Sequence, residues 1–180
     1  MGEGREALRM NRLQLATLLS WTGDSGMQGR KRLQKVVFFL QHAGCQLDCL
    51  FTLHHFGPYS RDVADACDEM VGAGLIQEHG GPSAGAMLYS YSLAPATRVL
   101  LDQTPYSTMQ PYQELGKNLI SEDLWHLELG STILFYFKQS GDWTEALNKA
   151  YEFKKVAASQ SQSCEALDLA KRVMAVSMGK

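Results

Sequence analysis

Residues 54–76, "HHFGPYSRDVADACDEMVGAGLI", decide the fold class of this chain. The β-branched and aromatic run "LFTLHHF" at 50–56 predicts a short strand, which the Gly-Pro pair that follows is expected to end. Ser60 then suits the N-cap of a helix, and two glycines at its far end weaken that helix and permit a sharp exit. The stretch therefore predicts a strand, a tight turn and a helix, in the order typical of proteins that read DNA.

Two helices are predicted before this stretch and a β-hairpin after it. Residues 7–22 place leucines on one broad face, and residues 29–44, "GRKRLQKVVFFLQHAG", place apolar side chains at helical spacing. Residues 75–79 and 87–93 bracket the loop "GGPSAGA", and the second segment alternates two tyrosines and a leucine onto one face. The order helix, helix, strand, helix, hairpin predicts a winged-helix-like core.

The second half of the chain reads as helical. Asp142 and Glu145 have the spacing of a capping box, with Asp in place of the usual Ser or Thr. We therefore predict a mainly α (α+β) protein: a winged-helix-like domain with a small β-hairpin at 1–103, a Pro-containing linker at 104–111, and a helical extension at 112–180. The C-terminal helical subdomain is expected to pack back on the core.

Composition limits the classes of function. The chain of 180 residues has 17 basic and 19 acidic residues, a net charge of −2, so no global field attracts it to phosphates or anionic lipid. No apolar run approaches the roughly 18 residues that cross a bilayer, and the N-terminus lacks the features of a secretory signal. We expect a cytoplasmic protein that makes no contact with a membrane.

Four residues raise the question of a metal site. Cys45 and Cys49 are separated by three residues, and His54 and His55 follow shortly after them. Zinc sites usually have more closely paired ligands and a second pair at a defined distance, so reduced cysteines and ordinary histidines are the preferred interpretation. Adjacent residues of a strand point to opposite faces, which also separates the two histidines for catalysis. We predict no metal, no cofactor and no catalytic residues.

The charge of the central helix argues against DNA. Residues 60–74 contain Arg61 as the one base and four acids, a local charge of −3. The phosphate backbone repels such a helix, and the loop "GGPSAGA" has no positive charge. Nucleic-acid binding through this helix is therefore disfavoured, and a basic protein surface suits its acidic face, Asp65 included.

Basic residues gather instead at the start of the preceding helix. Arg30, Lys31, Arg32 and Lys35 crowd its first turns, where positive charge opposes the helix dipole. On a helical wheel, Phe38 lies on the same side as the lysines. An aromatic residue on a charged face suggests a site for an acidic partner. In the alternative interpretation, C-terminal helices cover Phe38 and the lysines are solvated around it.

The Gly-Pro-Tyr turn also has two interpretations. Tyr59 beside the helix start is either packed in a rigid corner or, together with the backbone N–H groups of 60–62, part of a site for a partner's carboxylate. The candidate partner-binding residues are accordingly Arg30, Lys31, Arg32, Lys35, Phe38, Tyr59, Arg61 and Asp65.

Two motifs carry a resemblance to known families. "KRLQKVVFFLQHAG" followed by "FGPYSRDVADACDEMVGAGLI" and the strand "YSL" resembles the YwgA-like proteins, an uncharacterised bacterial and phage-associated group. More distantly, the Lys-Leu-Gln-Lys-type helix and the later Gly-Pro turn look like the SocA-type antitoxin domain called Panacea. The resemblance covers about residues 28–95 and implies no catalytic residues. Antitoxin relatives commonly have an apolar residue after their Gly-Pro turn, whereas this chain has Tyr59-Ser60.

These observations lead to one preferred function and two alternatives. We predict a non-enzymatic protein-interaction module with a protein partner, in a narrower form antitoxin-like or associated with phage or mobile elements. One alternative is a winged-helix transcription regulator that contacts DNA through the helix at 30–42. The other is an enzyme. The apolar C-terminal helices could also form a homodimer.

Overall fold

The computed structural model describes residues 10–83, 86–103, 107–155 and 160–179. It is mainly helical with a small antiparallel sheet, so the predicted fold class is confirmed; the winged-helix arrangement in particular stays a prediction. In chain order the elements are α1 (Arg12–Ser20), the 3-10 helix η1 (Gly23–Ser25), β1 (Met27–Gln28), α2 (Arg30–His42), β2 (Thr52–His54), β3 (Gly57–Tyr59), α3 (Arg61–Gly72), β4 (Ile76–Ser83), β5 (Ala86–Leu93), α4 (Pro95–Gln103), the 3-10 helix η2 (Ser107–Tyr112), α5 (Gln113–Ser121), α6 (Leu124–Ser140), α7 (Trp143–Lys154) and α8 (Gln160–Met178).

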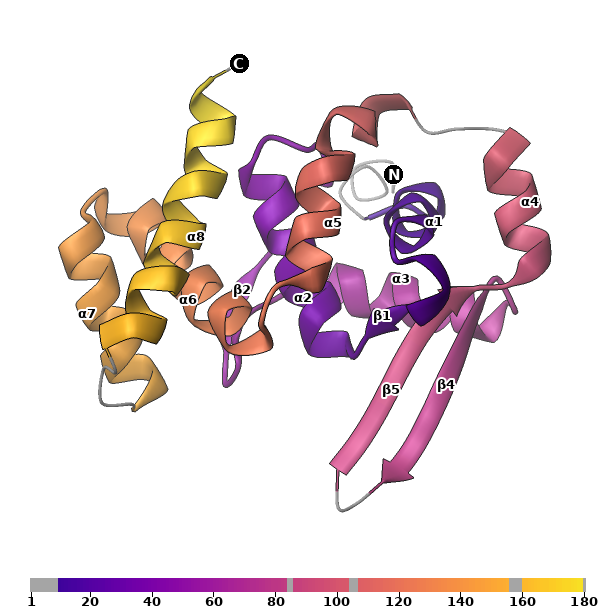
Figure 1. Ribbon diagram of the computed structural model, residues 1–180, viewed down its shortest axis with the longest axis horizontal. Helices are drawn as coiled ribbons and strands as arrows, with labels where there is room; N and C mark the ends of the chain where they lie inside the picture. Colours follow the sequence, from indigo (N-terminus) through magenta and orange to yellow (C-terminus); the bar gives the residue numbers. More distant parts are fainter. Residues whose placement is uncertain (1–9, 84–85, 104–106, 156–159, 180) are drawn as a thin grey trace, which may run out of the picture.

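Helix α2 lies at the centre of the molecule (Figure 1). All residues from Leu33 to Leu40 are buried, and the helix contacts α3, α5, α6 and α8 as well as β1 and β3. A helix covered on all sides over this length is a core helix. The burial leaves only its first turn, with Arg30 and Lys31, exposed to solvent.

The predicted hairpin is formed by β4 and β5, which pair in antiparallel register from Ile76 opposite Leu93 outward. The two strands project from the body of the molecule in Figure 1, and β1 adds a short third strand beside β5. Tyr91 and Leu93 are both buried, which confirms the predicted alternation of this strand where it meets the core.

The segment after α2 differs from the sequence prediction. Gly57 and Pro58 were expected to end a strand, but they form β3, the return strand of a small hairpin in which His54 pairs with Gly57. The chain reverses at His55 and Phe56, and Gly57 takes a φ of +95°, which glycine adopts without strain. The prediction of a single strand was therefore wrong, because the chain turns at His55 and Phe56 and continues as a second strand that begins at Gly57.

Helix α1 begins at Arg12, later than the predicted helix at 7–22, whose first three residues lie outside the described part of the chain. Asn11 forms a capping box with Gln14: each side chain accepts a hydrogen bond from the other residue's backbone N–H. The reciprocal bonds fix this start of the helix.

The C-terminal helices α6, α7 and α8 form the left-hand end of the molecule in Figure 1. α6 packs against both α7 and α8, and it also contacts α2 and β3 (Figure 1). The Asp142 side chain accepts a hydrogen bond from the Glu145 backbone at 2.8 Å, so this half of the predicted capping box of α7 is confirmed. The Asp142 N–H donates to the Ser140 hydroxyl instead of to Glu145. The linker at 104–111 falls partly outside the described residues, and its C-terminal part forms η2; the division into two domains stays a prediction.

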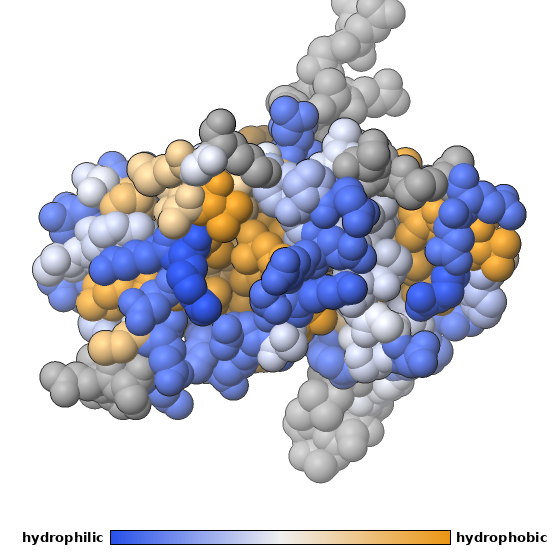
Figure 2. Space-filling view, turned by 45° about the horizontal axis from the view of Figure 1, so that its top comes forward, coloured by the Kyte–Doolittle hydropathy of each residue, from blue (hydrophilic) through white to orange (hydrophobic). Residues whose placement is uncertain are grey.

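Apolar side chains also gather on the surface. Figure 2 shows one such patch at the right-hand end of the molecule, over α4, where Val99 and Leu100 are exposed. Among the described helices, none combines the length and the apolar character needed to cross a membrane.

Candidate functional site

A pocket of about 400 Å³ opens between the start of α2, the β2–β3 hairpin and the first half of α3. This volume lies in the range of about 300–1,000 Å³ that is usual for ligand pockets. We call it the hairpin pocket. Its lining consists of Arg30, Lys31, Leu33, Gln34, Lys35, His54, His55, Phe56, Gly57, Tyr59, Val63, Ala64 and Cys67. It therefore brings together four of the eight predicted site residues: Arg30, Lys31, Lys35 and Tyr59.

Gln34 holds the corner between β3 and α3. Its side-chain amide donates to the Ser60 carbonyl at 2.9 Å, and its Oε1 accepts from the Ser60 backbone N–H at 2.8 Å. Both residues are buried. Ser60 occupies the predicted N-cap position of α3, but its hydroxyl makes no capping bond. The corner is thus held through the Ser60 backbone, by an amide on another helix.

Lys35 is the buried cation of the pocket wall. The residue is 2% exposed, and its ammonium donates to the Pro58 carbonyl at 2.6 Å. Burial lowers the pKa of the Lys35 ammonium to about 8, although the nearby Glu128 carboxylate opposes this shift. Both interpretations of the helical wheel, a partner site or solvated lysines, put Lys35 at the surface, and the structure corrects that: β3 and α6 cover this face of α2.

Two ammonium groups pair with the Glu128 carboxylate, which is itself buried on α6, and a third interacts with it electrostatically. Lys31 Nζ lies 3.6 Å from one carboxylate oxygen, and Lys154 Nζ, from α7, lies 3.2 Å from the other. Lys35 is the third cation that interacts with this carboxylate. We call these four residues the Glu128 cluster. With three positive charges and one negative, the cluster carries an excess of two positive charges beside the pocket.

The mouth of the pocket is aromatic. Lys31 Nζ lies 3.4 Å from the centre of the Phe56 ring, a cation–π contact, while Phe56 itself is 47% exposed. The His54 ring stacks on Tyr59 with centroids 4.7 Å apart. β2 ends at His54, so the alternation expected of a continuous strand does not reach His55, and both histidines line the pocket.

The floor of the pocket is apolar. Leu33, Val63 and Cys67 are each about 1% exposed or less. Burial raises the pKa of the Cys67 thiol to about 11, so the thiol stays protonated at neutral pH and is a poor nucleophile. The floor therefore offers contacts for an apolar group of a ligand.

Arg30 lies at the rim of the pocket, and its guanidinium is already bound by side chains of α3 and of the β4–β5 hairpin. Its Nε donates to the Tyr91 hydroxyl at 2.8 Å, and its guanidinium lies 2.6 Å from Asp68 and 3.5 Å from Glu78. The contacts with Tyr91 and Asp68 raise the pKa of Arg30, the bond to Tyr91 most of all. Arg30 thus ties α2 to α3 and to the β4–β5 hairpin, and its charge is balanced.

The other four predicted residues lie outside the pocket. Phe38 is 1% exposed and packs against Phe51 and His42, in accord with the interpretation that it belongs to the core. Phe38 is buried and does not line the hairpin pocket, so it is not part of the candidate site. Arg61 and Asp65 pair with each other at 3.5 Å on the exposed side of α3, where the Arg61 side chain is 86% exposed.

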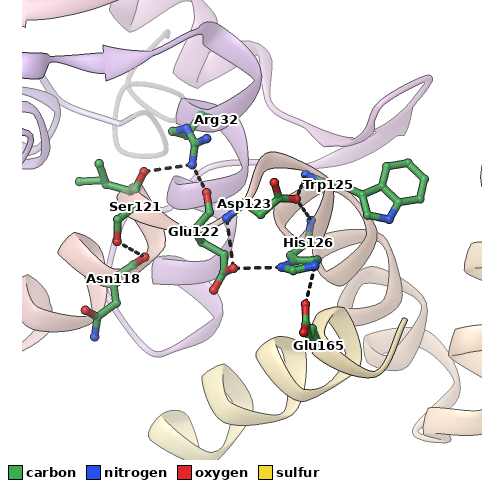
Figure 3. Close-up of polar contacts among 9 residues, drawn as sticks. Arg32, Asn118, Ser121, Glu122, Asp123, Trp125, His126 and Glu165 are labelled. Carbon is green, nitrogen blue, oxygen red and sulfur yellow. Dashed lines mark hydrogen bonds and ion pairs between the residues drawn. The ribbon is translucent and has the colours of Figure 1, made fainter. Parts of the chain in front are cut away.

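Arg32 holds α2 to the junction of α5 and α6 (Figure 3). Its guanidinium donates to the Ile120 carbonyl at 3.0 Å and to the Glu122 carbonyl, at the C-terminal end of α5. In the same junction, the His126 ring lies between two carboxylates, 3.1 Å from Glu122 and 2.8 Å from Glu165 of α8. Arg32 therefore has a structural role, since a cation stabilises the end of a helix where carbonyls are unpaired.

Several residues in the pocket lining and in the adjacent Glu128 cluster were not predicted from the sequence. Glu128 and Lys154 come from α6 and α7, far along the chain, and no local pattern connects them with α2. Phe56 could have been found, because an aromatic residue next to a Gly-Pro turn is often exposed. The part of the chain that the structure describes holds no group of three or more His, Cys, Asp or Glu side chains placed to bind a metal ion.

Fold and site define a mainly α protein with a ligand-sized pocket that has an apolar floor and a basic wall. The chain is similar to the uncharacterized protein YwgA of Bacillus subtilis (strain 168), with 29% identity over 122 residues. The aligned part is 67% of this chain and 73% of that relative, in accord with the predicted YwgA-like resemblance. The resemblance to the SocA-type antitoxin domain stays a prediction. No protein-family model matches the chain.

Proposed function

We propose that this protein is a non-enzymatic module that binds a protein partner through the face around the hairpin pocket. The observation that carries the proposal is the pocket itself, with exposed Phe56 and Lys31 at its mouth and an apolar floor behind them. An exposed aromatic side chain beside an apolar depression is typical of an interaction hot spot.

The state of the reactive groups supports binding rather than catalysis. The Cys67 thiol is protonated at neutral pH, and the Lys35 ammonium is held by the Pro58 carbonyl. The His54 ring is stacked on Tyr59 and exposed at the mouth. None of these groups is arranged as an activated nucleophile with a neighbouring base, which covalent catalysis requires.

A capture experiment with matched variants tests the proposal. The tagged protein, with nuclease-treated lysate of its own host, is compared with Phe56→Ser and with Val99→Ser on the distant α4 patch. Both changes remove one exposed apolar side chain, so they are matched for solubility. We expect a stoichiometric partner with wild type and Val99→Ser, and at least a tenfold loss with Phe56→Ser, the size of a hot-spot effect. Equal capture by all three proteins would contradict a pocket-centred interface.

The alternative of a DNA-binding regulator is weaker on structural grounds. It needs α2 in a groove of the duplex, but α2 is buried from Leu33 to Leu40, and its exposed Arg30 is paired with Asp68. An antitoxin-like role is a narrower form of the proposed function, in which the partner is a toxin. The identity of the captured protein decides that point.

A further inference from the structure

The charge balance of the pocket wall points to the chemistry of its ligand. Lys31 and Lys35 lie one turn apart on α2, and both line the hairpin pocket. The charged groups that act on Lys35 are the Glu128 carboxylate and the two other ammonium groups of the Glu128 cluster. Because one carboxylate is shared by three cations, an added anion would lower the repulsion among them.

The rest of the lining sets a second requirement. Leu33, Val63 and Cys67 form an apolar floor that offers no strong hydrogen-bond partner to a hydrophilic ligand. The one guanidinium at the rim, Arg30, is already held by Tyr91 and by Asp68. A dianion such as a phosphate ester needs many strong donors when it is desolvated, whereas a single carboxylate needs few.

We propose that the hairpin pocket binds a carboxylate attached to an apolar body. The carboxylate lies beside Lys31 and Lys35, and the apolar body lies on the floor against Leu33 and Val63. Such a ligand is either a free organic acid or the C-terminal residue of a protein, provided that its side chain is apolar. The second source rests on the proposed function, since it places the end of the partner chain in the pocket.

Calorimetric titration of the purified protein tests this inference. Phenylbutyrate is compared with phenylbutyramide, which has the same apolar body without the charge. A second arm compares a hexapeptide ending in Leu-Phe with the same peptide amidated at its C-terminus. We expect each acid to bind at least tenfold more tightly than its amide at pH 7. Tight binding of the peptide with weak binding of phenylbutyrate identifies a chain end as the ligand, and the reverse identifies a free acid.

The affinity for the acid should change with pH, whereas the affinity of purely apolar binding would not. The protonated fraction of an ammonium with a pKa of about 8 falls from about 0.9 at pH 7 to about 0.1 at pH 9. Affinity for the acid should therefore fall about tenfold between these values, with uptake of about half a proton per ligand at pH 8. His54 and His55 also line the pocket, and Cys67 stays protonated at pH 9 because burial raises the pKa of its thiol to about 11. Lys31, Lys154 and Glu128 are the other charged groups that face Lys35.

Two variants test whether the Lys35 ammonium is the cause of acid binding and of its pH dependence. Lys35→Met keeps the length of the side chain without its charge, and we expect it to weaken acid binding at least tenfold at pH 7 and to abolish the pH step. Lys149→Met makes the same change at an exposed site on α7 and should bind as wild type. The wild-type pH step and proton uptake need no variant, so the test holds even if Lys35→Met folds poorly.

Equal affinity for acid and amide, no binding of either acid, or an affinity that is the same at pH 7 and pH 9 would overturn the inference. The proposed partner binding is tested independently of this inference. If Phe56→Ser still loses the partner while no acid binds, the pocket face is an interface without a carboxylate site.

Discussion

Gly57→Ala is expected to destabilise the protein by roughly 3–5 kcal/mol, the sum of backbone strain and overpacking. Gly57 has a φ of +95°, and a Cβ at this position would lie 2.6 Å from Thr132 Oγ1 and 3.6 Å from Lys35 Nζ. The β2–β3 hairpin would have to move away from α6, and the pocket would lose its hairpin wall. Urea unfolding monitored by circular dichroism measures the change.

Gly74→Ala is the matched control for this prediction. Gly74 also has a positive φ, +69°, but no heavy atom lies within 4 Å of an added Cβ. Gly74→Ala should therefore destabilise the protein by the backbone strain alone, about 1–2 kcal/mol. The double variant Gly57→Ala/Thr132→Ala should recover part of the loss by removing the crowded hydroxyl. If Gly57→Ala costs no more than Gly74→Ala, the hairpin does not pack closely on α6.

Gln34→Ala should cost about 2–4 kcal/mol of folding free energy. It removes both hydrogen bonds to the Ser60 backbone and leaves a buried N–H and a buried carbonyl without partners, at roughly 1–3 kcal/mol each. The start of α3 and the adjacent pocket wall should loosen as a result. Hydrogen exchange at the Ser60 amide, together with urea unfolding, reports both effects.

Gln41→Ala provides the comparison within the same helix. Gln41 makes the same pair of bonds to the Cys49 backbone, at 2.9 and 2.8 Å, but these bonds are only partly buried. Water can replace part of the lost hydrogen bonding there, so we expect Gln41→Ala to destabilise the protein by about 1 kcal/mol. An equal or smaller cost for Gln34→Ala would show that the Ser60 corner does not depend on this amide.

The local parts of the structure could be predicted from the sequence. The apolar spacing of α2, the Asp142 cap of α7 and the alternation of β5 each depend on neighbouring residues, and the structure has all three. The basic start of α2 was also visible as a cluster, and half of the predicted site residues do line one pocket.

What could not be predicted depends on distant contacts. A helical wheel shows which residues share a face of α2, but not that β3 and α6 cover Lys35 or that Phe51 packs on Phe38. The partners of Lys31 at Glu128 and of Arg32 at Ile120 lie far along the chain. The β2–β3 hairpin was missed because a Gly-Pro pair usually ends a strand. The positive φ of Gly57 and the close approach of Thr132 explain the glycine, and both are seen only in the structure.

The most direct test of partner binding at the pocket is site-specific photo-crosslinking. A benzophenone amino acid replaces Phe56 at the mouth in one protein and Val99 on α4 in another; both positions are exposed. Each protein is irradiated in the host lysate, and the covalent adducts are identified by mass spectrometry. We predict a single abundant protein adduct from position 56 that is absent from position 99. Adducts from position 99 alone, or none from position 56 while the partner is still captured, would contradict the proposed interface.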